Sequence, residues 1–243
     1  MPSSPSRRAR LTGLISRPFA HRGLHGRGAI ENSRAAFEAA LAAGRGIELD
    51  VQASRDGVAF VFHDYELGRL TDARGKLAER SAGELSAIRL RGTQETIPTL
   101  EEVLALIRGR QGVLIEVKAP ERRVVGVSRA VGAALAGYKG AVAVMSFNPE
   151  VSRWFASNAP ETLRGLVVTE AGRRWRGWIA RHLALWGARP DFLAYDIRDL
   201  PSSFAEAQRR NGLPVLTWTC RGDSDWARAG EHADQVIYEE PAR

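Results

Sequence analysis

The chain has 243 residues, of which 44% are hydrophobic and 26% charged, which is the composition of a folded globular protein. No apolar run is long enough to cross a bilayer, and residues 1–16 contain no continuous apolar stretch, so we expect neither a membrane span nor a secretory signal. Because Cys220 is the only cysteine, an internal disulfide is excluded, and we expect a cytoplasmic location.

Basic residues outnumber acidic residues by 35 to 28, which gives a net charge of +7. This excess mildly favours an anionic ligand such as a phosphate or a lipid head group. A general preference for arginine explains it better, since Lys76, Lys118 and Lys139 are the only lysines. The arginines are scattered and no nucleic-acid-binding motif is present, so we expect no nucleic-acid partner.

Short β-branched runs alternate with helical patterns along the whole chain. Strands are expected at residues 18–22, 46–53, 112–118, 141–147, 163–168, 191–196, 213–219 and 234–239. Helices are expected near residues 33–43, 99–109, 121–137, 149–158, 173–186, 202–211 and 223–230. Thr99 and Glu102 have the spacing of a capping box, and Gly44 follows the first helix where a C′ glycine belongs.

Strands separated by helices imply right-handed βαβ units in a parallel sheet. About 250 residues is typical of a (β/α)8 TIM barrel, so we expect an α/β protein in which residues 1–243 form a single barrel domain. A doubly wound open sheet is the alternative. No GxGxxG fingerprint follows the first strand, which removes one reason to prefer it.

One segment interrupts this alternation after the second strand. The stretch "SRDGVAFVFHD" contains Asp56-Gly57, which predicts a type I′ turn and a short hairpin that returns His63 toward the strand end. Residues 65–98 then form a long polar inserted segment before the next helix, and segments of that length are usually functional or mobile.

Two of the expected strands carry charged side chains on one face. Glu48 and Asp50 lie two residues apart in "IELDVQ", and Glu116 and Lys118 do so in "LIEVK". Three carboxylates on the inner face of a barrel would suit Mg²⁺ or Ca²⁺, which prefer oxygen ligands. The alternative is a buried salt-bridge network that pairs Glu116 with Lys118 and the other carboxylates with Arg22.

His21 and His63 both fall at the ends of expected strands. Two imidazoles are what phosphodiester cleavage requires, one to accept the proton of the attacking oxygen and one to protonate the leaving oxygen. Either histidine alone would more often be structural. Together with the carboxylates and Arg22, they favour a catalytic site over a salt-bridge network.

These motifs resemble the glycerophosphodiester phosphodiesterase family. The resemblance rests on "AHRG", "EN", "IELDVQASRDGVAFVFHD" and "IEVK" in this order, and "IPTLEEVL" and "SFNPE" extend it over most of the chain. It implies a (β/α)8 barrel that uses a divalent cation to hydrolyse glycerophosphodiesters to glycerol 3-phosphate and an alcohol. The attacking group would be water or the neighbouring hydroxyl of the substrate, the latter giving a cyclic phosphate first.

The resemblance also implies roles for individual residues. His21 and His63 would be the acid/base pair, and the divalent cation, Mg²⁺ or Ca²⁺, would have as its ligands Glu48, Asp50 and Glu116. Arg22 and Lys118 would hold the phosphate, and Glu31 and Asn32 would support the site. Trp218 would either face the glycerol carbons or belong to the core.

The C-terminal end departs from the family pattern. The chain reads "WTCRG" at residues 218–222 and "IYEEP" at residues 237–241, where relatives commonly have W-T-V-N and T-D-x-P. We expect these differences to affect the glycerol or alcohol end of the pocket and not the metal centre. Cys220 is expected to be an inert barrel residue, because nothing beside it would activate a thiolate.

The segment "RRWRGWIARHLALW", residues 173–186, combines tryptophans at helical spacing with arginines. We favour an ordinary barrel helix that buries this stripe, with no catalytic role for His182. The alternative is transient contact with an anionic membrane surface.

The leading hypothesis is therefore a phosphodiesterase that acts on glycerophosphodiesters. Two rivals stay open. One is a phospholipase D-type cleavage of lysophospholipids by the same centre. The other is a barrel that binds phosphodiesters without cleaving them.

Overall fold

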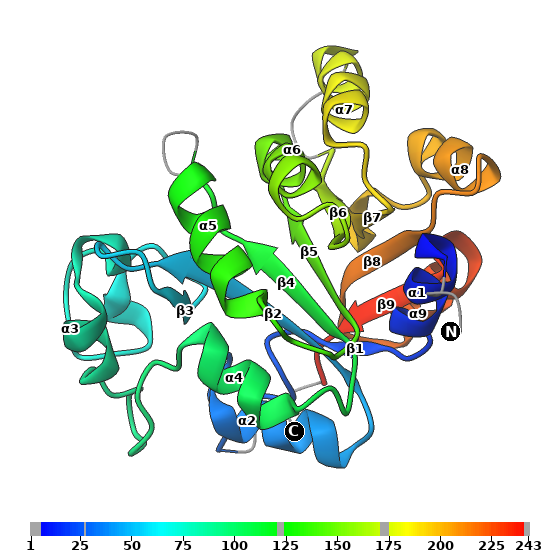
Figure 1. Ribbon diagram of the computed structural model, residues 1–243. Coiled ribbons are helices and arrows are strands. Elements are labelled where there is room, and N and C mark those ends of the chain that lie inside the picture. Colours follow the sequence, from blue (N-terminus) through cyan, green and yellow to red (C-terminus); the bar gives the residue numbers. More distant parts are fainter. Residues whose placement is uncertain (1–5, 27, 121–123, 171–174, 241–243) are drawn as a thin grey trace, which may run out of the picture.

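Eight parallel strands close into a barrel surrounded by helices (Figure 1). The computed structural model describes residues 6–26, 28–120, 124–170 and 175–240. The barrel strands are β1 (Phe19–Ala20), β2 (Gly46–Ala53), β4 (Val113–Val117), β5 (Val142–Ser146), β6 (Leu163–Val168), β7 (Phe192–Asp196), β8 (Val215–Cys220) and β9 (Gln235–Tyr238). Strand β1 pairs in parallel with both β2 and β9, which closes the sheet. The expected (β/α)8 TIM barrel is confirmed.

Each expected helix is present, with ends that differ from expectation by a few residues. The helices are α1 (Arg7–Leu14), α2 (Arg34–Ala42), α3 (Ala82–Ser86), α4 (Leu100–Ile107), α5 (Val124–Leu135), α6 (Pro149–Asn158), α7 (Trp175–Ala188), α8 (Ser203–Arg210) and α9 (Asp223–His232). The expected starts of the helices at 121 and 173 lie outside the described residues. Helix α1 was not expected. Its Leu11 and Leu14 pack against the interior residue Phe19.

The alternation of β2 follows the prediction. Ile47, Leu49 and Val51 are fully buried in an apolar cluster with residues of α2, α4 and α5. Because successive side chains of a strand point to opposite faces, Glu48 and Asp50 turn into the barrel. Both are 1% exposed. The capping box of Thr99 with Glu102 and the positive φ of Gly44 (66°) are also confirmed.

A hairpin follows β2, as expected, but its turn differs from the prediction. Strand β3 (Ala59–Val61) runs antiparallel to β2, with Val51 opposite Val61. The type I′ expectation is wrong, because Gly57 has a positive φ (88°) and Asp56 does not. The turn is a three-residue loop closed by the hydrogen bond from Gly57 N to Ser54 O, 3.1 Å. Such a loop needs glycine only at its last position.

The inserted segment is not the purely polar excursion that the sequence suggested. Its short turns η1 (Leu67–Arg69) and η2 (Leu77–Glu79) and helix α3 surround a separate apolar core with Phe60 and Phe62 of the hairpin. The apolar residues that the segment contributes are Leu67, Leu77, Leu85, Leu90 and Ile97, all almost fully buried. This core packs η1 firmly beside the open end of the barrel.

Helix α7 contradicts the expectation that it buries its tryptophan stripe. Trp178 and Trp186 are 54% and 70% exposed, and Leu183 is 62% exposed. In Figure 1 the helix stands on the outside of the barrel beside α6. Among the described residues, no helix combines the length and the apolarity needed to cross a membrane.

Candidate active site

Most of the predicted site residues line one cavity at the carboxyl ends of the barrel strands. The cavity has a volume of about 500 Å³, and its lining includes His21, Arg22, Glu48, His63, Glu116, Lys118 and Trp218. A second cavity of about 780 Å³ adjoins it and shares His63, Glu116, Lys118 and Phe147. Asp50 lies beneath the floor, buried at 1% exposure. Segments far apart in sequence therefore meet at the end of the barrel where parallel barrels carry their sites.

Glu48, Asp50 and Glu116 form a compact acidic triad. One carboxylate oxygen from each lies within 4.8 Å of the other two. Asp50 and Glu116 occupy paired positions of β2 and β4, so the sheet register itself brings them together. Burial, together with the charge of Asp50, raises the pKa of Glu48 to about 8. The triad thus concentrates more negative charge than a buried site accepts without a cation.

Two cations compensate part of this charge. Lys118 Nζ lies 2.9 Å from Asp50 Oδ1 and also contacts Glu116, and Arg22 Nε lies 3.2 Å from Asp50 Oδ2. Burial alone would raise the pKa of Asp50, but Lys118 and Arg22 hold it well below its usual range. The salt-bridge network considered as an alternative is therefore present alongside the triad. Within the triad, this network does not reach Glu48 Oε1, which is buried without a hydrogen-bond partner among the described residues.

That unpartnered oxygen decides whether the residues fit a divalent cation. A buried carboxylate oxygen without a hydrogen-bond donor is costly, and Glu48 belongs to a cluster whose other members are carboxylates. Hard cations such as Mg²⁺ and Ca²⁺ take such oxygen ligands. The residues present therefore fit the cation that the sequence suggested, although Lys118 already competes for two of the three carboxylates.

The loop after β1 brings further side chains to the triad. Arg22 and Asn32 both have φ near +58°, a left-handed conformation that is uncommon for residues other than glycine. The backbone N–H of Arg22 donates to Glu48 Oε2 at 3.0 Å, and Asn32 Nδ2 donates to Asp50 Oδ2 at 2.9 Å. Arg22 Nη1 donates to Glu31 at 2.8 Å. Glu31 therefore orients the guanidinium of Arg22, and Asn32 orients the carboxylate of Asp50.

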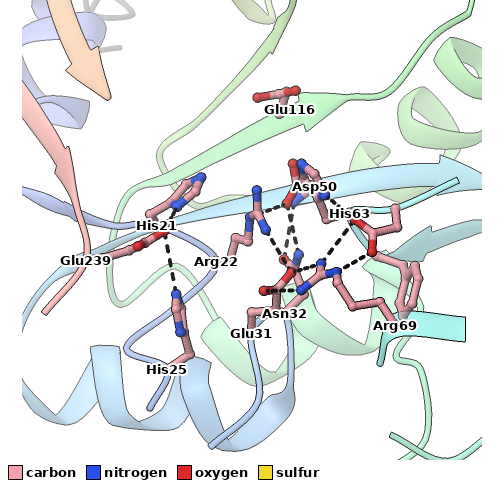
Figure 2. A network of polar contacts seen from close by, with 12 residues as sticks. His21, Arg22, His25, Glu31, Asn32, Asp50, His63, Arg69, Glu116 and Glu239 are labelled. Carbon is pink, nitrogen blue, oxygen red and sulfur yellow. Dashed lines mark hydrogen bonds and ion pairs between the residues drawn. The ribbon is translucent and has the colours of Figure 1, made fainter. Parts of the chain in front are cut away.

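His21 is held by a residue that sequence reasoning missed. Glu239 Oε1 lies 2.6 Å from His21 Nδ1 (Figure 2). Arg221 Nε donates to Glu239 Oε2 at 2.7 Å. Burial lowers the pKa of His21, but the bond with Glu239 and the charge of Glu48 outweigh it, so the pKa is raised. At Glu239 the contacts with His21 and Arg221 outweigh the effect of burial and lower the pKa of the carboxyl to about 2.

This arrangement adds a role for the C-terminal end of the chain. Arg221 belongs to "WTCRG" and Glu239 to "IYEEP", the two stretches expected to affect the glycerol or alcohol end of the pocket and not the metal centre. Glu239 contacts His21, and Arg221 contacts Glu239. The signal was present in the sequence, since a carboxylate stands just beyond the last strand.

His63 has a similar partner, which the "HD" motif contained without its role being assigned. Asp64 Oδ1 lies 2.6 Å from His63 Nδ1. Arg69 of η1 contacts Asp64 and donates to both oxygens of Glu31 at 2.6 and 2.9 Å. Gln52 Nε2 donates to the carbonyl of Asp64 at 2.6 Å. The inserted segment thus contributes Arg69, which links the loop after β1 to the loop of His63.

Trp218 belongs partly to the core and also lines the cavity. Its indole N–H donates to the carbonyl of Ala194 at 2.9 Å, and its ring meets Phe147 edge-on at a centroid distance of 5.6 Å. It packs against the interior cluster and also lines the cavity. Cys220 is fully buried, in keeping with an inert barrel residue.

Comparison with known proteins places this site in a family. A family model described as "Glycerophosphoryl diester phosphodiesterase family" matches residues 21–242. A glycerophosphodiester phosphodiesterase of Caldanaerobacter subterraneus subsp. tengcongensis is 28% identical over 236 residues, which are 92% of this chain and 93% of the relative. YhdW of Bacillus subtilis is 36% identical over 222 residues, covering 86% of this chain and 88% of that protein.

A solved structure agrees with these relatives. An Oleispira antarctica phosphodiesterase in complex with the product sn-glycerol-3-phosphate superposes with a TM-score of 0.78 at 25% identity, over 91% of each chain. The family match spans the barrel from His21 onward, including the acidic triad and both histidines. The chain therefore belongs to the glycerophosphoryl diester phosphodiesterase family of enzymes.

Proposed function

We propose that the protein hydrolyses glycerophosphodiesters to glycerol 3-phosphate and an alcohol, with a divalent cation and two catalytic histidines. The observation that carries this proposal is that His21 and His63, each held at Nδ1 by a carboxylate, line the same cavity as Glu48 and Glu116. The product in the Oleispira antarctica structure, sn-glycerol-3-phosphate, supports the same substrate class.

The carboxylates beside the histidines prepare them for proton transfer. A carboxylate at Nδ1 favours the tautomer with a proton on that nitrogen, so Nε2 is the atom that exchanges protons with the substrate. One histidine accepts the proton of the attacking oxygen, and the other donates a proton to the alcohol oxygen as its bond to phosphorus breaks. After hydrolysis the oxygen of water is bonded to phosphorus, and the alcohol leaves as a neutral molecule.

Glu48, Asp50 and Glu116 would hold the divalent cation. When bound, the cation supplies Lewis-acid polarisation of the phosphodiester. Arg22 and Lys118 compensate the charge of Asp50, and both line the catalytic cavity. They are therefore placed to contact the phosphate oxygens of the substrate. Trp218 and Phe147 give the same cavity an apolar wall for the carbon skeleton of the substrate.

A lysophospholipid is the second candidate substrate. Tyr65 and Phe147 are 48% and 47% exposed, and both line the larger cavity beside His63. Two exposed aromatic rings at the mouth of a polar site offer apolar surface to an acyl chain, and they also suit the quaternary ammonium of a choline head group. The same catalytic groups would then release the head-group alcohol from a lipid.

The test is release of glycerol 3-phosphate from glycerophosphocholine and of choline from lysophosphatidylcholine, each with Mg²⁺, with Ca²⁺ and with a chelator. We expect cation-dependent turnover that His21→Ala and His63→Ala abolish. His232→Gln is the matched control, because His232 lies on α9 away from the cavity and should leave turnover unchanged. Binding of glycerophosphocholine without turnover would instead identify a non-catalytic barrel.

A further inference from the structure

Helix α7 has its apolar residues on the wrong side for a barrel helix. Most of the described side chains that it turns toward the barrel are small: Gly177 and Ala188 are buried, and Ala184 packs partly against the core beside Leu185. Four of its large apolar side chains point outward, with exposed fractions of 43% for Ile179, 54% for Trp178, 62% for Leu183 and 70% for Trp186. A helix that only covered a barrel would have the opposite arrangement.

The space between α7 and the barrel is not filled by the large outward-pointing side chains of the helix. A cavity of about 490 Å³ separates α7 from β6, and its lining includes Leu166, Val168, Ala180 and Ala184. The large side chains of α7 would fill such a cavity if the helix turned on its axis. They are instead held outside, where Trp178 stacks on His182 at a ring-centroid distance of 4.0 Å. The outward face of α7, formed by Trp178, Ile179, Leu183 and Trp186, is therefore an apolar surface in contact with solvent.

The charge of this segment is uniformly positive. Residues 171–190 contain five arginines and one histidine and no aspartate or glutamate. Among the described side chains of this set, Arg181 turns toward the barrel, where its Nη2 lies 3.3 Å from Glu170 Oε2, whereas Arg189 is exposed. Exposed tryptophans and aliphatic side chains combined with basic residues are typical of helices that lie in the interface of an anionic membrane.

We propose that the outward face of α7 docks on an anionic lipid surface. Two copies of this chain would bring the same arginine-rich segment against itself in a symmetric dimer, which like charges oppose. An anionic lipid surface complements both the charge and the apolar side chains.

Docking would also orient the catalytic cavity. Helix α7 follows β6, so it begins at the end of the barrel where the cavity opens. Phe147 lines both the catalytic cavities and the cavity beneath α7. The lipid surface would therefore lie beside the mouth of the site. The consequence for lipid-derived substrates rests on the proposed function, whereas the docking itself does not.

Sedimentation with vesicles tests the docking directly. We expect the protein to pellet with phosphatidylglycerol vesicles and not with phosphatidylcholine vesicles, and 1 M NaCl should weaken the binding. The double variant Leu183→Gln/Trp186→Gln should lose about tenfold or more in partition, because two exposed apolar side chains no longer enter the interface. Val125→Gln on α5 is the matched control, since Val125 is 55% exposed outside this face.

Turnover of glycerophosphocholine is measured in the same preparations without vesicles. The double variant should keep its rate and its melting temperature, because neither residue lines the catalytic cavity. Equal binding to both vesicle types, or unchanged binding by the double variant, would overturn the proposal. A dimer that forms in the unaltered protein and is lost in the double variant would also overturn it, because the face would then be an interface between two copies of the chain. Vesicle binding by a protein without phosphodiesterase activity would contradict only the proposed function.

Discussion

Glu239 Oε1 lies 2.6 Å from His21 Nδ1, a contact that joins the end of the last barrel strand to the end of the first. Because β1 pairs with β9, the closure of the barrel creates this contact. We expect Glu239→Gln to lower kcat by about 10- to 100-fold with little change in KM, since a neutral amide stabilises the imidazolium less. Steady-state kinetics on glycerophosphocholine measures both quantities.

The neighbouring carboxylate gives the control for this prediction. Glu240 is exposed, so Glu240→Gln should leave kcat unchanged. Glu239→Asp keeps the charge and should recover part of the rate. Full activity of Glu239→Gln at an unchanged melting temperature would show that His21 does not need its carboxylate.

The acidic triad makes a prediction about cation affinity. Glu48→Gln, Asp50→Asn and Glu116→Gln should each weaken binding of Mg²⁺ or Ca²⁺ by about tenfold or more, because each removes one charged oxygen ligand. Isothermal titration calorimetry on chelator-treated protein measures this without any turnover. Glu84→Gln is a suitable control, since Glu84 lies in the inserted segment as the capping partner of Ser81. Unchanged affinity in all three variants would leave the triad as a salt-bridge network alone.

The inserted segment should contribute to catalysis through Arg69. Its guanidinium bonds Glu31 and contacts Asp64, which in turn holds His63. Lysine cannot reproduce this planar fork, so Arg69→Lys should lower kcat about tenfold. Because the Arg69 side chain is 46% exposed, the free energy of unfolding should change by no more than about 1 kcal/mol.

Arg80 provides the matched comparison for Arg69. It belongs to the same inserted segment, and its ion pair with Glu84 spans 3.4 Å at a similar exposure. Arg80→Lys should therefore keep the full rate. Equal losses in the two variants would mean that the segment acts through its general stability and not through Arg69.

Cys220 should resist alkylation in the folded protein. Burial, with the charge of Asp225, raises the pKa of its thiol to about 12, so the thiol stays neutral at pH 8. We expect iodoacetamide to react about a thousandfold more slowly than with free cysteine, following the smaller thiolate fraction. Reactivity should reach the free-cysteine rate in guanidinium chloride, and mass spectrometry follows the modification. Rapid labelling of the native protein would contradict the buried position.

The sequence predicted the barrel and the acidic triad because both depend on local periodicity. Alternation with a period of two places Glu48 and Asp50 on one face of a strand, whatever surrounds that strand. Glu116 follows the same rule on β4, and the parallel register then pairs it with Asp50. The Thr99 cap likewise involves residues three positions apart. Such features need no knowledge of distant contacts.

The apolar core of the inserted segment, the contact of Arg69 with Glu31 and the carboxylate partner of His21 could not be predicted in this way. Glu239 is 218 positions from His21, and Arg69 is 38 positions from Glu31. Neither separation carries a periodic signal, because the contacts form only when the barrel closes and the apolar core of residues 65–98 packs. The turn of the hairpin was also mistaken, since Asp-Gly suits more than one loop length.

The orientation of helix α7 could not be predicted from the sequence pattern. Its sequence has one face of small residues and another of tryptophan, isoleucine and leucine, and either could pack on a barrel. Composition and period therefore determined that a helix forms here and that the chain is a barrel with carboxylates inside. Only the packing against β6 and α6 decided which face of the helix turns inward, as only barrel closure decided which carboxylate holds His21. Both choices depend on shape and charge complementarity between segments far apart in the chain, which no local pattern encodes.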